Sequence, residues 1–267
     1  MNILHISDIH FRQVYDQVET GYKGMIAKMD NPLLQLRKSL ADIKNKQEIE
    51  LLLISGDLTE DGEVSDYSFL KEWLCHEIGD IPIIVTLGNH DIKANFYQGW
   101  LKEDPSGQPY NTVVTFEDFN VISFDSSIHG RPDGQMTDGQ FKWLQEQLEK
   151  HQEKPMILMT HHHVLKQQSS MPPLPEAKKL LKLISGYPVL CLLNGHTHHV
   201  YQGDVNGIHS YTADGMSFVG EEEGQGNIRF EQRFGYNFYR VRHGVMISQI
   251  SESFFTGKII ARVDMIE

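Results

Sequence analysis

The chain has 267 residues, of which 40% are hydrophobic and 22% are charged, an ordinary balance for a globular protein. No apolar run approaches the roughly 18 residues that a membrane-spanning helix needs. The formal net charge of −12 argues against a long nucleic-acid footprint, which requires a basic stripe, but it allows a phosphate-bearing small molecule if bound metal ions supply positive charge.

Cysteine usage and the first residues bear on the compartment. Cys75 falls in a predicted helix and Cys191 in a predicted buried strand, so we expect both to be small core residues rather than a disulfide. The opening segment, M-N-I-L-H-I-S-D, has neither the basic nor the apolar stretch of a signal peptide. We therefore expect a cytoplasmic protein.

Short apolar runs alternate with amphipathic ones over the first 200 residues, a pattern typical of an α/β protein. One helix is predicted from Pro32 to about Lys46 with Asn31 as its N-cap, and a second begins near Ser65. A third begins at Thr137, where T-D-G-Q has the form of a capping box. Strands are expected at 3–6, 51–54, 82–87, 113–116, 121–124, 156–159 and 188–193.

Beyond Thr197 the helical period disappears. Short alternating segments predict antiparallel strands and hairpins there, at 200–202, 208–211, 236–242, 245–250 and 258–263. The polar run E-E-E-G-Q-G-N at 221–227 is expected to be an exposed hairpin loop. Because no linker composition interrupts the chain, we expect a single domain over residues 1–267.

Five of the predicted strands run directly into polar side chains. In an α/β sheet the carboxyl ends of such strands gather along one edge, where ligands bind. The glycines in these segments let the backbone turn sharply and approach a bound group closely. The segments are Ser7-Asp8-Ile9-His10, Ser55-Gly56-Asp57, Gly88-Asn89-His90-Asp91, Thr160-His161-His162-His163 and Asn194-Gly195-His196-Thr197-His198.

The donor types in these segments indicate metal ions. Carboxylates, imidazoles and one amide oxygen suit divalent ions such as Mn²⁺, Fe²⁺, Zn²⁺ or Co²⁺, and the lack of thiolates argues against a structural zinc site. The donors are too many for one ion with open positions, but they suit two ions about 3.5–4 Å apart that share a bridging carboxylate. Only Asp8 and Asp57 among them are anionic, so two divalent ions would leave the centre positive enough to receive a phosphate.

The ordered set D-x-H, G-D, G-N-H-D, H and G-H-x-H, spread over residues 1 to about 200, resembles the calcineurin-like metallophosphoesterase superfamily. The resemblance implies a four-layer α/β/β/α sandwich with the active site at the C-terminal ends of the central strands. It also implies two metal ions with Asp57 as the bridge. The other ligands it implies are Asp8, His10 and His198 for one ion, and Asn89, His161 and His196 for the second.

The same resemblance implies that a metal-bridging hydroxide attacks phosphorus. His90 would face the substrate and protonate or hydrogen-bond the departing oxygen, with Asp91 orienting it. Asn89 would lie beside the substrate as well as on the metal. His162 is either a substrate contact or a solvated loop residue, and His163 is expected to be structural.

Further segments are similar to the class III cyclic-nucleotide phosphodiesterase branch of that superfamily: S-F-D-S at 123–126, G-Q-M-T-D-G-Q-F-K-W-L after it, and G-Y-N-F-Y-R near the C-terminus. The fourth block departs from that branch. Its enzymes often show His-His-Pro-Pro, whereas this chain has His-His-His-Val from His161, which leaves the choice of ligand within 161–163 open.

The function implied is a dimetal phosphohydrolase, and a phosphodiesterase acting on 3′,5′-cyclic nucleotides is the first hypothesis. A phosphomonoesterase or a nucleotide pyrophosphatase is the alternative, and the rim segments 12–30, 92–110, 126–136 and 164–176 would decide between them. A non-catalytic scaffold would have lost ligands, and here all are present. Manganese or iron is the expected metal, with zinc, cobalt and magnesium open. The expected partner is a small-molecule phosphoester, and a homodimer is left open.

Overall fold

A computed structural model describes residues 1–205 and 207–265 and places their strands in two six-stranded sheets. The first sheet has the order β10-β11-β1-β2-β3, with β12 paired to the other side of β11; the second has the order β4-β5-β6-β7-β9-β8. The bounds in the first sheet are β1 (Asn2–Ile6), β2 (Leu51–Ser55), β3 (Ile83–Thr86), β10 (Val219–Gly224), β11 (Asn227–Arg242) and β12 (Val245–Asp264). Those in the second are β4 (Thr112–Thr115), β5 (Asn120–Ser123), β6 (Met156–Met159), β7 (Val189–Asn194), β8 (Tyr201–Val205) and β9 (Ile208–Thr212).

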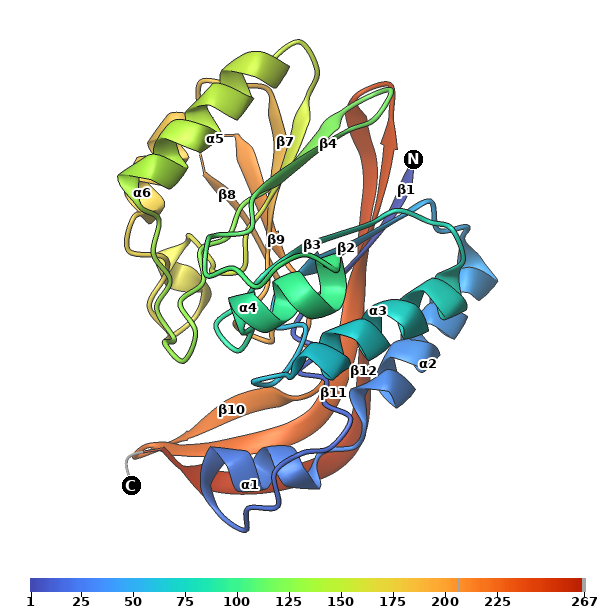
Figure 1. The fold of residues 1–267 in the computed structure, drawn as a ribbon, viewed down its shortest axis with the longest axis vertical. Coiled ribbons are helices and arrows are strands. Elements are labelled where there is room, and N and C mark those ends of the chain that lie inside the picture. Colours follow the sequence, from blue (N-terminus) through green and yellow to red (C-terminus); the bar gives the residue numbers. More distant parts are fainter. Residues whose placement is uncertain (206, 266–267) are drawn as a thin grey trace.

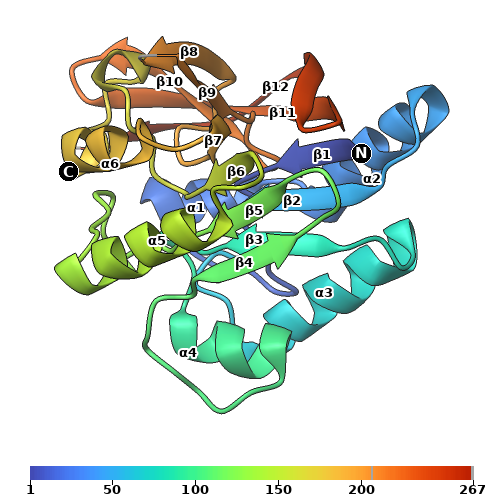
Figure 2. The ribbon, with the colours of Figure 1, turned by 90° about the horizontal axis from the view of Figure 1, so that it is seen from above.

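Helices cover the outer face of each sheet (Figures 1 and 2). The first sheet carries α2 (Pro32–Lys46), α3 (Val64–Ile78) and the short α4 (Lys93–Phe96), which continues as a π-helical turn over Tyr97–Leu101. The second sheet carries α5 (Asp138–His151) and α6 (Ala177–Ile184), and a 3₁₀ turn covers Lys166–Gln168. α1 (Gly21–Lys28) lies apart from both groups, against the far ends of β11 and β12.

Alternation along the central strands builds three apolar layers. In β1, Ile3 faces the second sheet, whereas Leu4 faces α2 and α3, because successive side chains of a strand point to opposite faces. In β6, Ile157 faces the first sheet and Leu158 faces α5 and α6. Three buried layers between two sheets and two sets of helices are an α/β/β/α sandwich, so the predicted fold class is confirmed.

The helix start signals are also confirmed. Asn31 caps α2 by accepting a hydrogen bond from Leu33 N at 3.0 Å. Thr137 caps α5: its Oγ1 accepts from Gln140 N at 3.3 Å, and Gln140 Oε1 accepts from Thr137 N at 3.0 Å. Each side chain satisfies a backbone donor that the first turn of a helix leaves free.

Several expectations were wrong in detail. Cys75 is exposed on α3 and only Cys191 is a core residue. β9 pairs in parallel with β7, so the C-terminal strands are not all antiparallel. The segments at 245–250 and 258–263 form one strand, β12, because a bulge near Gly257 interrupts their alternation without ending the pairing with β11. Within the described residues, no helix is both long and apolar enough to cross a membrane.

Candidate metal centre

The loops that carry the predicted ligands meet between the two sheets. β1, β2 and β3 run parallel to one another in the first sheet, and β6 and β7 run parallel in the second. The loops after these five strands bring together all seven predicted ligands, of which each is at most 9% exposed: Asp8, His10, Asp57, Asn89, His161, His196 and His198.

The ligand atoms form two neighbouring groups. In the first, His198 Nε2 lies 3.4 Å from Asp8 Oδ1 and 3.2 Å from His10 Nε2. The second contains Asp57, His161 and His196. The Asn89 amide oxygen joins this second group, at 3.3 Å from His161 Nε2. These are the two sets that the resemblance implied.

Asp57 touches both groups. Its Oδ2 lies 3.6 Å from His10 Nε2 and 3.3 Å from His161 Nε2, and its Oδ1 accepts a hydrogen bond from His90 N at 2.8 Å. Burial alone would raise the pKa of Asp57, but the neighbouring His161 imidazole holds that pKa well below its ordinary value. The carboxylate is therefore anionic and is positioned to be shared between two cations.

Hydrogen bonds place a proton on Nδ1 of three imidazoles. His161 Nδ1 donates to Ser55 O and His198 Nδ1 to Phe218 O, both at 2.7 Å, and a carbonyl can only accept. His10 Nδ1 donates to Glu60 Oε2 at 2.6 Å. With Nδ1 occupied in this way, each ring turns Nε2 toward the centre, and in its neutral form that atom offers a lone pair, as in metal-binding histidines.

This arrangement fits metal ions. Among the described residues, His196 Nε2 is buried without a hydrogen-bond partner, and such an atom costs free energy unless something binds it. The Nε2 atoms of His10 and His198 lie 3.2 Å apart, a distance at which two neutral imidazoles repel and a shared cation relieves the repulsion. A centre lined by lone pairs and two carboxylates is satisfied by cations, and its nitrogen and oxygen donors suit divalent transition ions.

The backbone of the centre is strained. Five of the seven predicted ligands have a positive φ, a conformation that side chains other than glycine rarely adopt. Each such residue costs about 1 kcal/mol or more and persists only when the surrounding structure enforces it, which is typical of functional sites. The five are Asp8 (54°), His10 (50°), Asp57 (48°), His196 (72°) and His198 (55°).

Two positions in these loops require glycine because neighbouring atoms lie too close for any side chain. A Cβ on Gly88 would lie 2.2 Å from Asp57 Oδ1, and one on Gly195 would lie 1.9 Å from Ser7 Oγ and 2.8 Å from Asp8 Oδ2. No side chain fits at these distances, so the G-N-H-D and G-H-T-H loops can pack against the aspartates only through glycine.

His90 lies at the open side of the centre, and its ring partner differs from the one expected. Its side chain is 26% exposed, and its Nδ1 lies 3.1 Å from Glu60 Oε1. Burial disfavours its charged form, but the carboxylates of Asp57 and Glu60 raise the pKa of His90 to about 10, and bound cations would oppose this. Glu60, which sequence reasoning missed, orients His90 in place of Asp91.

Asp91 instead joins the loop after β2 to the loop after β3 through hydrogen bonds. Its carboxylate accepts hydrogen bonds from the backbone amides of Leu58, Thr59 and Gly88 at 2.9–3.1 Å and from Tyr67 Oη at 3.0 Å. A fully buried side chain with these partners cannot also reach the His90 ring. The expectation that Asp91 orients His90 is therefore wrong.

The histidines that follow His161 do not reach the open side. His162 is fully buried, and its Nδ1 lies 2.8 Å from Ser126 Oγ. His163 is fully buried as well. Full burial shows that His162 is not a solvated loop residue, and its role as a substrate contact stays a prediction.

A second loop that sequence reasoning missed supports the first group. Met216 N donates to Ser7 O at 2.9 Å, and Ser217 Oγ donates to Asp8 O at 2.8 Å. Phe218 supplies the carbonyl that holds His198. The residues at 213–218 follow β9 without a recognisable motif, so only the fold shows that they brace the D-x-H segment.

Residues 1–200 match the calcineurin-like phosphoesterase family. The chain belongs to this family. A probable cyclic nucleotide phosphodiesterase of Rhodococcus erythropolis is 28% identical over 207 residues, 74% of this chain and 64% of that protein. A probable glycerophosphodiester phosphodiesterase, GpdQ, of Arcobacter nitrofigilis is 29% identical over 210 residues, 75% of this chain and 72% of that protein.

A 3′,5′-cyclic adenosine monophosphate phosphodiesterase, CpdA, of Escherichia coli strain K12 is 28% identical over 167 residues, 61% of this chain and 59% of that protein. The matches therefore span less than two-thirds of this relative and of the Rhodococcus one. Among solved structures, a dimetal phosphatase from Danio rerio superposes with a TM-score of 0.61 at 12% identity, covering 94% of this chain and 98% of that one. At this identity the likeness shows the fold alone.

Proposed function

We propose that this member of the calcineurin-like phosphoesterase family is a two-metal phosphodiesterase, built as a single domain. The observation that carries the proposal is the position of Asp57. One of its oxygens lies between the lone pair of His10 and that of His161, which belong to two separate groups of donors. A shared carboxylate between two open metal sites is the arrangement that clamps an in-line displacement at phosphorus.

The residues fall into two ligand sets. Asp8, His10 and His198 would hold one ion, Asn89, His161 and His196 would hold the other, and Asp57 would be shared between them. When bound, the two ions supply positive charge for the phosphate oxygens and lower the pKa of water, so that a nucleophile is available near neutral pH. Manganese, or iron with manganese, is the metal we propose.

The protein groups at the open side act on the leaving group. Glu60 accepts from His90 Nδ1, which leaves His90 Nε2 to donate toward the oxygen that departs from phosphorus. Asn89 faces the centre with its amide oxygen, and we propose that its amide also contacts the substrate. With water as the proposed nucleophile, the reaction needs no covalent intermediate on the protein.

The substrate class that we propose is a small phosphodiester, with 3′,5′-cyclic nucleotides first. The names of the Rhodococcus and Escherichia relatives support this choice. The name of the Arcobacter relative supports glycerophosphodiesters as a second candidate. Both substrates have an alcohol leaving group, which needs a proton as it departs.

A panel of phosphate esters with Mn²⁺ tests the proposal. The panel comprises cyclic nucleotides, glycerophosphodiesters, a nucleotide pyrophosphate, a monoester and bis(p-nitrophenyl) phosphate, with Asp57→Asn as the matched inactive control. We expect turnover of at least one diester that exceeds the turnover of the monoester. Monoester turnover above that of every diester would overturn the phosphodiesterase assignment, and hydrolysis that survives in Asp57→Asn would overturn the metal centre.

Replacing His90 separates leaving-group chemistry from metal binding. His90→Ala should keep the Mn²⁺ content and lower kcat for an alcohol leaving group by roughly 10²–10⁴-fold, the range for a lost general acid. The loss should be smaller for nitrophenolate, which departs without a proton. If the variant loses a metal ion, or slows both leaving groups equally, then His90 is a ligand or a phosphate-binding residue instead.

A further inference from the structure

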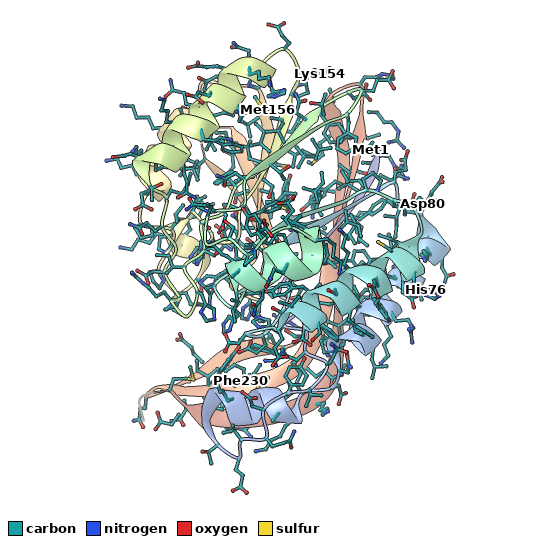
Figure 3. All side chains as sticks on the ribbon, viewed as in Figure 1. Met1, His76, Asp80, Lys154, Met156 and Phe230 are labelled. Carbon is teal, nitrogen blue, oxygen red and sulfur yellow. The ribbon has the colours of Figure 1, made fainter. Side chains whose placement is uncertain are left out.

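α1 docks beside the centre on a platform formed by the C-terminal strands. Met25 and Ile26 of α1, and Met29 just after it, are at most 7% exposed and pack against Phe218, Phe230 and Val263. Phe230 lies on the part of β11 that extends beyond the sandwich toward α1 (Figures 1 and 3). The docking is apolar and buried, so α1 has a fixed place against the far ends of β10, β11 and β12.

The docked helix places one tyrosine close to the centre. Tyr22 is partly buried, and its hydroxyl donates to Glu60 Oε2 at 3.2 Å. Its ring lies 5.7 Å from the ring of His90 and 6.2 Å from that of Phe218, measured between centroids. Tyr22 therefore contacts the residue that orients His90 as well as the His90 ring itself.

Glu60 receives three hydrogen bonds from three parts of the chain. His10 and Tyr22 donate to Oε2, and His90 donates to Oε1. The terminal torsion of a glutamate side chain is broad, so the plane of its carboxylate is set by its hydrogen-bond partners. Tyr22 on α1 is one of these three partners. The plane of Glu60 in turn sets the direction of the His90 ring.

We propose that Tyr22 is a positioning residue for leaving-group protonation, and that α1 is the element through which the C-terminal strands hold His90 in its working orientation. This inference rests on the proposed function. Tyr22 acts through Glu60 and moves no proton itself. Its hydroxyl keeps Glu60 in one rotamer, and its ring limits the space into which the His90 ring can turn.

Tyr22→Phe tests the proposal because it removes the hydroxyl and keeps the ring packed on Phe218. Hydrolysis of diphenyl phosphate and of bis(p-nitrophenyl) phosphate is compared in the Mn²⁺-loaded full chain. We expect kcat to fall about tenfold for the phenolate ester, the effect of one hydrogen bond to a charged group, and about threefold or less for the nitrophenolate ester. KM and Mn²⁺ content should not change. Tyr201→Phe, the same atom change on β8, is the matched control.

A second variant tests the same step by weakening the packing of α1. Ile26→Ala loosens α1 and leaves Tyr22 and Glu60 intact, so it should reproduce the selective loss for the phenolate ester in weaker form. Equal losses for the two esters, loss of Mn²⁺ or no change in Tyr22→Phe would each overturn the proposal.

A measurement without substrate keeps the two proposals distinguishable. In metal-free protein, Tyr22→Phe should shift the imidazole NMR signals of His10 and His90, assigned through their own variants, and leave those of His162 in place. Unshifted signals would overturn the positioning role. If these signals shift but the wild-type protein with Mn²⁺ hydrolyses no phosphodiester, then the proposed function fails while the Tyr22–Glu60–His90 connection stands.

Discussion

At the scale of single residues, hydrogen-bond partners place the ring protons of several histidines in and near the centre. His161 and His198 donate from Nδ1 to backbone carbonyls. His5, one layer below on β1, has hydroxyl partners instead: Ser55 Oγ at 2.8 Å from Nε2 and Tyr239 Oη at 3.2 Å from Nδ1. Hydroxyls can donate or accept, so they satisfy a neutral imidazole, and full burial lowers the pKa of His5 to about 3.

The buried His5 makes stability depend on pH. A histidine whose pKa is depressed in the folded state contributes its full stability above the unfolded pKa of about 6.5 and loses it as the pH falls toward 3. Between pH 7.5 and pH 5 the loss is about 2 kcal/mol, from 1.36 kcal/mol per pKa unit. The free energy of unfolding of the wild type minus that of His5→Gln, measured under one metal condition, should fall by this amount. A difference that stays constant with pH would show that His5 is charged when folded.

The meeting of the seven predicted ligands was predictable from sequence because each follows the end of an apolar strand, where side chains converge. Glu60 and Tyr22 were not, because the same residue types in a loop or on a short helix are usually solvated. Their role depends on distances across the fold, such as the 3.1 Å between Glu60 and His90. The misassignment of Asp91 has the same origin: adjacency in sequence to His90 suggested a contact that the turn does not make.

At the scale of elements, the loops after β2 and β3 behave as one unit because Asp91 joins them. Its carboxylate accepts backbone donors from both loops and the hydroxyl of Tyr67 on α3. These loops carry Asp57 and Asn89. The contribution of Asp91 is therefore to the stability of the loop pair, whereas that of Glu60 is to the orientation of imidazoles.

Asp91→Ala should therefore lower mainly stability, whereas Glu60→Gln should change mainly the selectivity between leaving groups. Asp91→Ala leaves buried donors without an acceptor, at about 1–3 kcal/mol each, so the free energy of unfolding should drop by at least about 3 kcal/mol. The folded molecules of this variant should still hydrolyse both esters, and the ratio of phenolate-ester turnover to nitrophenolate-ester turnover should stay near the wild-type value. Glu60→Gln, nearly equal in shape, should lower this ratio with a smaller loss of stability. The reverse pattern would restore Asp91 as the residue that orients His90.

The elements that sequence reasoning found are those with caps or a clear period, such as α2 and α5. α1 was missed because its eight residues include two glycines and its apolar side chains are few. It is stabilised by Phe230 and Val263, which lie some 200 residues further along the chain. No local pattern reports such a contact, and the unbroken length of β12 was hidden by its bulge for a related reason.

At the scale of the whole molecule, the sandwich brings two sheets together so that their strand ends share one centre. β1, β2 and β3 supply Asp8, His10, Asp57 and Asn89, and β6 and β7 supply the remaining three ligands. The layer of Ile3, Leu53, Ile157 and Leu193 between the sheets sets their spacing. Each proposed metal site takes residues from loops of both sheets, so the centre forms only when the sheets are packed together.

The central claim, that two ions act together across Asp57, is tested most directly by titrating metal-free protein with Mn²⁺. Bound Mn²⁺ per chain is measured together with turnover of bis(p-nitrophenyl) phosphate. We expect turnover to be absent without metal, to rise steeply only as the second ion binds and to saturate at about two ions per chain. Full turnover with one bound ion, or turnover that persists after exhaustive chelation, would contradict it.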